Sequence, residues 1–501
     1  MFYLVSILTI WFGFANPVGQ FPPGVLLFPL IMYHLSLSQG PVKRVMGSAW
    51  LFGAMVYSTC LYWIAYPVIN FTSVPLVVAI ACPILLGLYL GIYPLLYSLG
   101  LWYIKEYPFL LKLPLAIFLW SFIEYLRGHL FTGLPWLSLC QAFAHYPWSI
   151  QAIRYIGPYL LSGVFSGIAI CIYEIGRKRS WAILPAALLS LLLYLPAFPS
   201  SPIPSKGFIS CGAVQGNINQ YHKWDTQYQD LTLHTYLSLT TEAISSLHST
   251  PSPALVVWPE TAMPFYFTTS SPHLRKILRF TILHKIILLT GAPGFRMRDR
   301  GVSYFNSAYL IVRGKIVARY DKVHLVPFGE YVPLSRYFPF LKKMVQGPGD
   351  FTPGTRLYPL RWRNLAIGTL ICYEVIFPEL VAREVQRGAN LLVNISNDAW
   401  FGDSSGPYQH LNQAILRAVE TNRYLIRSTN DGISAIISPR GKVVRRLWLF
   451  KQGEITYDKV ALVETMTFYT RHWRLLRYVI LIGTLIPWGI ICFLKVLAGS
   501  K

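Results

Sequence analysis

Long hydrophobic runs with almost no charge follow one another through the first 200 residues, and one more lies near the C-terminus. A helix needs about 20 apolar residues to cross a bilayer, and most of these runs approach that length. The pattern predicts a polytopic α-helical membrane domain of about eight spans. They are expected near residues 1–15, 24–38, 46–66, 75–102, 113–124, 153–175, 181–199 and 475–497.

Residues 200 to about 470 follow another pattern, in which strand-like runs alternate with helical periodicity and charges are regular. This alternation predicts a layered α/β domain. Strands are expected at Ile209–Gln215, Ala254–Trp258, Ile286–Gly291, Tyr304–Val312, Lys315–Tyr320, Leu365–Cys372, Asn390–Ile395, Tyr424–Ser428, Ile433–Ser438 and Lys442–Trp448. Helices are expected at Thr226–His248, Pro272–His284, Pro378–Gln386 and Gln409–Asn422. The predicted domains are therefore residues 1–199, 207–465 and 475–497.

Composition agrees with a membrane protein, since 54% of the 501 residues are hydrophobic, only 13% are charged and the mean hydropathy is +0.43. The net charge of +23 could indicate a nucleic-acid partner, but no DNA- or RNA-binding motif is present. Much of the basic excess flanks the apolar runs, where anionic lipid would attract it. We expect no nucleic-acid partner.

The position of Lys and Arg between the runs predicts orientation, because cytoplasmic loops retain positive charge. With about eight alternating spans, one face carries most of the basic residues, while the short loops of the other have little beyond Arg127 and Arg154. Both termini would then be cytoplasmic and the α/β domain would face a periplasm-like space. The basic positions are Lys43, Arg44, Lys105, Lys112, Arg177, Lys178, Arg179, Lys495 and Lys501. Residues 1–15 lack a basic start and are followed by further spans, so a cleaved signal peptide is not expected.

Three residues at predicted strand ends have complementary chemistry: Glu260, Lys322 and Cys372. A thiol needs an acceptor for its proton and a nearby positive charge before it attacks a carbonyl. Glu260 would act as general base and Cys372 as nucleophile. Lys322 and the backbone N–H just after Cys372 would donate to the oxyanion. A lone buried Cys or a lone loop Lys or Glu is usually structural, so the prediction depends on all three together.

The sequence around these residues is specific: Trp258-Pro259-Glu260, Asp321-Lys322-Val323-His324 continuing to Phe328-Gly329-Glu330, and Ile371-Cys372-Tyr373-Glu374. It resembles the Glu-Lys-Cys pattern of the nitrilase (carbon-nitrogen hydrolase) superfamily, which implies an α-β-β-α sandwich. Within that superfamily the chain looks like an apolipoprotein N-acyltransferase. That closer resemblance includes Gln215 to Ile218, Lys223 to Asp225, Ser396 to Gly402, Arg427 to Asn430, Glu124 to Gly128 and Gly133 to Trp136.

This resemblance implies that Cys372 takes an acyl chain from a phospholipid as a thioester. The chain then passes to the α-amino group of the diacylglyceryl-modified N-terminal cysteine of an apolipoprotein. It also implies support by Glu330 and Glu374 and substrate contact by Trp224 and Tyr373, for which ordinary packing is the alternative. Asn397, Asp398 and Trp400 would shape the pocket. The expected location is a bacterial inner membrane with the catalytic domain in the periplasm, and we expect a monomer.

No cofactor is expected. The seven cysteines are dispersed without metal-site spacing, and His324 and His410 have no acidic or Cys partner at such spacing, so we expect no metal. An outward location permits disulfides, which leaves a bridge between Cys211 and Cys372 as an alternative to a free nucleophile.

Residues 331–351 mix aromatic and basic side chains in a way that suits a membrane interface. One hypothesis is a mobile lid, and the other is a loop that covers the core. In the lid, Tyr337, Phe338, Phe340 and Leu341 would enter the outer leaflet while Lys342 and Lys343 meet headgroups.

Two other functions stay open. A membrane-tethered hydrolase would end the cycle with water instead of an amine. A non-catalytic transporter or scaffold would suit the many spans, but it would not be expected to retain all three of Glu260, Lys322 and Cys372.

Overall fold

The computed structural model describes residues 1–72, 74–194, 196, 204–247, 253–268, 271–298, 301–332 and 351–499. Its contacts divide the chain into two compact units. The helical unit comprises Met1–Ala65, Pro75–Ser200 and Thr467–Lys501, and the α/β unit comprises Tyr66–Val74 and Ser201–Met466. Of the segment considered as a lid, residues 333–350 lie outside the described residues, so that hypothesis and its alternative stay untested.

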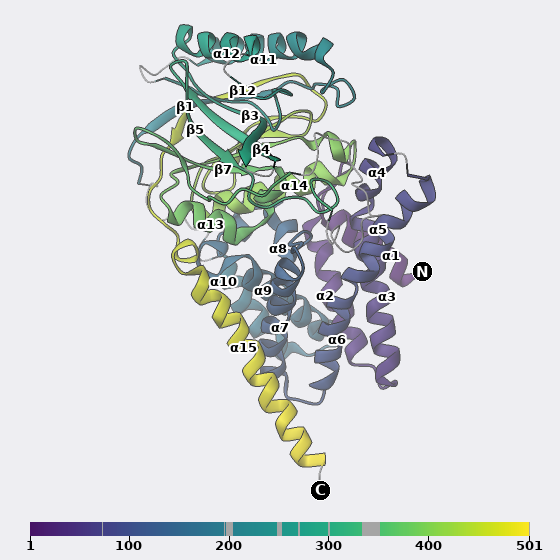
Figure 1. Ribbon diagram of the computed structural model, residues 1–501. Coiled ribbons are helices and arrows are strands. Elements are labelled where there is room, and N and C mark those ends of the chain that lie inside the picture. The colour runs from purple at the N-terminus through teal and green to yellow at the C-terminus, as the bar shows by residue number, and fades with distance from the viewer. Residues whose placement is uncertain are drawn as a thin grey trace. The chain divides into compact units, whose positions relative to one another are not determined.

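Every apolar run of the sequence is helical in the part that the structure describes. The helices of this unit are α1 (Phe2–Gly13), α2 (Leu27–Ser36), α3 (Val42–Cys60), α5 (Leu76–Leu90), α6 (Ile92–Tyr103), α7 (Phe109–His129), α8 (Leu139–Ala142), α9 (Ile153–Gly176), α10 (Ile183–Tyr194) and α15 (Phe468–Gly499) (Figure 1). Helix α4 (Ala65–Phe71) lies almost entirely in the α/β unit.

Helix length separates the candidate spans into two groups. Among the described residues, four stretches are long and apolar enough to cross a membrane: Leu76–Tyr103, Phe109–His129, Ile153–Gly176 and Phe468–Leu497. A fifth is possible if Val42–Cys60 and Tyr62–Phe71, bent by 58° at their junction, form one span. Helix α1, with 12 residues, is only about 18 Å long against a hydrocarbon core of about 30 Å. The structure therefore supports four or five of the eight predicted spans by length.

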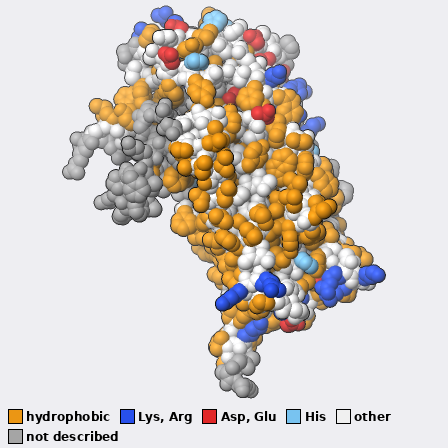
Figure 2. Space-filling view, turned by 90° about the vertical axis from the view of Figure 1, so that its right-hand side faces the viewer, with side chains coloured by type: hydrophobic (Ala, Val, Ile, Leu, Met, Phe, Trp, Pro, Cys, Tyr) orange, Lys and Arg blue, Asp and Glu red, His pale blue; other side chains and the backbone are white. Residues whose placement is uncertain are grey.

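The outside of the helical unit is strongly apolar. Large hydrophobic side chains are exposed along α5, α10 and α15, among them Leu76, Val77, Leu85, Leu184, Leu188, Leu485, Ile490 and Phe493. Figure 2 shows one face of the molecule, on which orange side chains form a broad band with Lys and Arg gathered at its lower end. An apolar surface of this extent is typical of helices that face lipid.

The α/β unit contains two six-stranded sheets. The first has the order β12-β1-β2-β3-β4-β5 and the second β11-β10-β9-β8-β7-β6. Strands β1, β2 and β3 are parallel, as are β7, β8 and β9. The strands are β1 (Phe208–Gln215), β2 (Leu255–Val257), β3 (Ile287–Arg298), β4 (Gly301–Val312), β5 (Lys315–Asp321), β6 (Leu360–Trp362), β7 (Leu365–Ile371), β8 (Leu391–Ser396), β9 (Leu425–Thr429), β10 (Ser434–Ile437), β11 (Val443–Leu447) and β12 (Gly453–Ala461).

The two sheets pack face to face and helices cover their outer faces. One core cluster joins side chains of both sheets, such as Ala213 and Leu289 with Ile367 and Val393. A second cluster joins the outer face of the first sheet to α11 (Gln229–Ser246) and α12 (Pro272–Leu283), which run along it in Figure 1. Helices α13 (Pro378–Gln386) and α14 (Ser405–Thr421) pack on the second sheet. The predicted α-β-β-α sandwich is confirmed.

Candidate active site

The three predicted catalytic residues each follow the end of a strand. Glu260 comes shortly after β2, Lys322 directly after β5, and Cys372 directly after β7, where a short 3-10 helix (Cys372–Ile376) begins. All three side chains are buried, with exposed fractions of 7%, 1% and 8%. Strand ends hold such groups on a rigid frame.

Glu260 and Lys322 lie together. The Lys322 Nζ atom is 3.8 Å from Glu260 Oε1. Asn306 donates a hydrogen bond to Glu260 Oε1 at 2.6 Å, and the backbone N–H of Asn397 donates to Oε2 at 2.9 Å. The carboxylate is thus held on both oxygens, with one oxygen also facing the ammonium.

Glu330 is the nearest carboxylate to the lysine. Its oxygens lie 3.0 and 2.9 Å from Lys322 Nζ. The backbone N–H of Val326 donates to Glu330 at 2.8 Å, and Asn306 donates at 2.9 Å. Asn306 therefore bridges Glu260 and Glu330 with one amide group, and both carboxylates share the charge of Lys322.

Cys372 is a free thiol, as is Cys211, so the structure does not contain the disulfide that the sequence left open. The backbone of Cys372 has φ of +50°, in the left-handed region that residues other than glycine rarely adopt. Burial raises the pKa of the thiol, with a further rise from Glu260 and an opposing effect from Lys322. Both charged groups are thus close enough to influence the sulfur.

The charges of the site favour a neutral thiol beside a charged lysine. Burial by itself would lower the pKa of Lys322, but the carboxylates of Glu330 and Glu260 outweigh it and raise that pKa. Burial raises the pKa of Glu260, while the Lys322 ammonium opposes this rise. A raised carboxyl pKa makes Glu260 a better proton acceptor, which suits transfer of the thiol proton during attack.

Glu374 holds the backbone on both sides of the site. Its Oε1 accepts hydrogen bonds from the N–H groups of Val323 and His324, directly after Lys322, at 2.7 and 3.1 Å. Its Oε2 accepts from the N–H of Ile371, directly before Cys372, at 2.8 Å. Burial raises the pKa of Glu374 to about 7. This carboxyl ties the lysine turn to the cysteine turn.

The two predicted substrate contacts differ in exposure. Trp224 lies in the turn before α11 and is 38% exposed. Tyr373 is partly buried, and its ring packs edge-on against Phe377 with centroids 5.1 Å apart. Of the residues predicted to shape the pocket, Trp400 packs on Phe71 with ring centroids 4.8 Å apart, and Asp398 is buried.

Two polar residues of the site have no role in the sequence prediction. Asn306 lies in β4, between Phe305 and Ala308, where a polar pair interrupts an apolar run. This polar pair within an apolar strand is the feature of the sequence that could have indicated a site residue here. Lys223 is 2% exposed and donates to the backbone carbonyl of Glu260 at 3.3 Å, and burial lowers its pKa to about 8. Lys223 belongs to a stretch that carries the family resemblance, but the sequence alone does not indicate its contact with Glu260.

His324 and His410 lie in different surroundings. The His324 ring stacks on Phe377 with centroids 3.8 Å apart. His410 is fully buried and contacts Asp398 and the backbone carbonyl of Cys372. Within the described part of the chain, no group of three or more His, Cys, Asp or Glu side chains could hold a metal ion.

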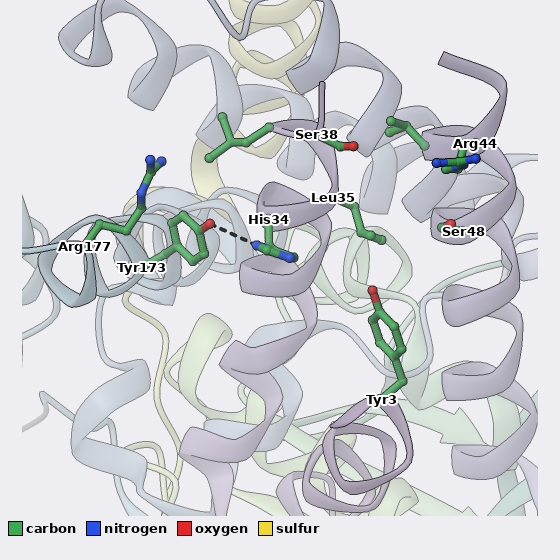
Figure 3. Close-up of a pocket in the computed structure, with 10 residues that line it drawn as sticks. Tyr3, His34, Leu35, Ser38, Arg44, Ser48, Tyr173 and Arg177 are labelled. Atoms are coloured by element: carbon green, nitrogen blue, oxygen red, sulfur yellow. Dashed lines mark hydrogen bonds between the residues drawn. The ribbon is translucent and has the colours of Figure 1, made fainter. Parts of the chain in front are cut away.

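A separate cavity of about 520 Å³ lies in the helical unit, between α1, α2, α3 and α9. Its lining includes Tyr3, His34, Arg44, Tyr173 and Arg177, and His34 Nδ1 lies 2.9 Å from the Tyr173 hydroxyl (Figure 3). Its lining residues all belong to the helical unit, so it contains none of the predicted catalytic groups.

Comparison with known proteins assigns both units. The family model of the apolipoprotein N-acyltransferase N-terminal domain matches residues 8–171, and that of carbon-nitrogen hydrolases matches residues 211–466. An apolipoprotein N-acyltransferase of Geobacter metallireducens is 34% identical over 94% of this chain and 91% of its own. The chain belongs to the apolipoprotein N-acyltransferase family. The enzyme of the same name from Azotobacter vinelandii is 31% identical over 94% of this chain and 91% of its own.

Family membership agrees with the architecture of both units. The family model of the N-terminal domain matches mainly the helical unit, and the α/β unit is a carbon-nitrogen hydrolase domain. Among solved structures, the chain is similar to Nit3 of Saccharomyces cerevisiae, with 19% identity over 55% of this chain and 96% of that one and a TM-score of 0.40.

Proposed function

We propose that this chain is a phospholipid-dependent apolipoprotein N-acyltransferase, which acylates the N-terminal cysteine of diacylglyceryl-modified apolipoproteins through a Cys372 thioester. The observation that carries the proposal is the buried pair of the Glu260 carboxylate and the Lys322 ammonium, 3.8 Å apart. The charges of both groups act on the pKa of the Cys372 thiol. Family membership over 94% of the chain supports the acceptor class.

In the first step, the Cys372 sulfur attacks an ester carbonyl of the phospholipid while Glu260 accepts the thiol proton. The C–O bond then breaks, Glu260 returns the proton to the leaving alkoxide, and lysophospholipid departs. Cys372 is left as a thioester.

In the second step, the α-amino group of the apolipoprotein attacks the thioester carbonyl. Glu260 accepts a proton from the attacking amine and returns it to the departing sulfur, which restores the thiol. An amide bond forms as the C–S bond breaks, so the cycle needs no cofactor. The order of events gives ping-pong kinetics.

Lys322 and the backbone N–H of Tyr373 would stabilise the oxyanion in both steps. Glu330 would fix the lysine by its 2.9 and 3.0 Å contacts, and Glu374 would fix the turns that carry Lys322 and Cys372. Trp224 and the Tyr373 ring would contact substrate, while Asn397, Asp398 and Trp400 would shape the pocket.

For topology, we propose eight spans in a bacterial inner membrane, with domains at residues 1–199, 207–465 and 475–497 and the catalytic domain in the periplasm. This number is supported by the four long stretches, the bent pair and three shorter apolar helices. The shorter helices are Phe2–Gly13, Pro22–Ser36 and Ser180–Tyr194. Each coincides with a predicted run. The enzyme would act as a monomer.

The function is tested by incubating the purified chain with a phospholipid and a diacylglyceryl-cysteine peptide, and identifying products by mass spectrometry. The proposal predicts N-acylated peptide and lysophospholipid in equal amounts, and neither with Cys372→Ala. Free fatty acid without acylated peptide would instead identify a hydrolase.

A further inference from the structure

A buried polar network lies directly behind Cys372, on the carbonyl side of its peptide group. His410, on α14, places Nε2 3.2 Å from the carbonyl oxygen of Cys372. Asn394, on β8, places Nδ2 3.5 Å from the same oxygen. Because a carbonyl oxygen only accepts hydrogen bonds, Nε2 of His410 must carry the proton there.

Arg427 orients both of these donors. Its side chain on β9 donates to Asn394 Oδ1 and lies 3.0 Å from His410 Nδ1. The same guanidinium forms an ion pair of 2.6 Å with Asp398, whose other oxygen lies 3.1 Å from His410 Nδ1. Arg427 and His410 have no exposed surface, and Asp398 is 2% exposed.

Neither His410 nor Arg427 can act on substrate from this position. His410 contacts the Cys372 carbonyl, and Arg427 contacts Asn394, Asp398 and His410. The network nevertheless controls the direction of one functional group. In a planar trans peptide the C=O and N–H point in opposite directions. Holding the Cys372 carbonyl toward His410 therefore turns the N–H of Tyr373 away from the network.

We propose that His410, held by Arg427 and Asp398, is a positioning residue that locks the peptide between Cys372 and Tyr373 with its N–H aimed at the oxyanion. This inference rests on the proposed function, because it concerns the same thioester chemistry. Cys372 has a strained φ of +50°. Without the hydrogen bond from His410, the peptide would rotate to relieve this strain.

The test compares two reactions of the same sulfur. Alkylation by iodoacetamide displaces iodide and forms no oxyanion, whereas acylation by an ester passes through one. In the full-length enzyme, His410→Phe removes the donor at similar size, and His410→Gln supplies an amide N–H in its place. We expect His410→Phe to slow acylation by about 10²-fold while alkylation stays within about twofold of wild type. His410→Gln should recover most of the acylation rate.

Glu420→Gln is the matched control, because Glu420 is buried on the same helix and pairs with Arg417 instead. It should leave the ratio of the two rates unchanged. If His410→Phe does not fold, Asp398→Asn provides a second variant and should lower the same ratio.

An acylation rate equal to wild type in His410→Phe, or a parallel fall of both rates in every folded variant, would overturn the positioning role. Failure of the proposed function gives a different result, namely no acylation of Cys372 in the wild-type enzyme itself.

Discussion

At the scale of single residues, the charge on Lys322 depends on its carboxylate neighbours. The lysine is almost fully buried, and burial alone would favour its neutral form. Glu330 contacts it at 2.9 and 3.0 Å and Glu260 at 3.8 Å. The closer carboxylate, Glu330, therefore contributes most to keeping Lys322 protonated.

Replacing Glu330 by Gln should consequently slow acylation of Cys372 by about 10- to 100-fold, because a poorly held ammonium stabilises the oxyanion less. The rate is measured by stopped incubations with phospholipid and intact-mass analysis. Glu464→Gln, an exposed carboxylate paired with Lys206, should match wild type. An undiminished rate in Glu330→Gln would show that Lys322 does not need this neighbour.

Glu384 on α13 is fully buried, and its carboxyl oxygens have no hydrogen-bond partner among the described residues. Burial raises its pKa to about 8, above about 4.3 in an unfolded chain. The folded state favours the protonated form of Glu384. Its contribution to the free energy of unfolding is therefore fully present below about pH 4 and is lost as the pH rises to about 8.

Glu384→Gln should therefore gain stability over wild type as pH rises from about 4 to 8, by on the order of 2–4 kcal/mol at the upper end. The measurement is the thermal unfolding midpoint of both proteins across this range. Glu242→Gln, at an exposed position on α11, should show no such trend. A constant difference at all pH values would contradict the assignment.

At the scale of elements, the site depends on the close packing of β3 against the turn that carries Glu260. A Cβ atom at Gly291 would lie 2.5 Å from the backbone nitrogen of Thr261 and 2.8 Å from Glu260 Cα. Such contacts are too short, so any side chain at this position must displace the turn.

Gly291→Ala should lower the acylation rate by about 10²-fold with little change in protein yield, since a shift of about 1 Å in a catalytic group has effects of this size. Gly212→Ala in strand β1 of the same sheet is the control, because its Cβ would meet nothing closer than 3.4 Å. Equal activity in both variants would mean that the turn tolerates movement.

Most elements could be predicted because hydrophobic periodicity reports which face of a strand or helix is buried. The ten predicted strands are all present, and Glu260, Lys322 and Cys372 follow strand ends as expected. Strands β6 and β12 were missed for physical reasons. Strand β6 has only three residues, and β12 (Gly453–Ala461) is charged and mostly half-buried. The partners of His410 could not be predicted, because they come from three separate elements.

At the scale of the whole molecule, composition predicts a membrane protein more readily than it predicts the number of spans. Hydropathy marks apolar runs but does not say where a helix breaks, and in the described part of the chain four stretches are long enough on their own to cross a membrane. The proposed eight spans place the charged loop at Lys178 and the α/β unit on opposite sides of the membrane.

Cysteine labelling in cells tests this topology. In a background with Cys82, Cys372 and Cys492 replaced by Ser, so that no reactive thiol remains in the α/β unit, Ser246→Cys should react with an impermeant maleimide in intact spheroplasts. Lys178→Cys should react only after permeabilisation. Labelling of both positions from the outside would contradict the proposed orientation.

The central claim is that Cys372 carries the acyl chain as a thioester. Intact-mass analysis of the wild-type enzyme after incubation with phospholipid alone tests it most directly, because no amine is present to remove the chain. The account predicts a mass increase of one acyl group that maps to Cys372, disappears with hydroxylamine and is absent in Cys372→Ala. An unmodified Cys372, in enzyme that still transfers acyl chains when the peptide is added, would contradict it.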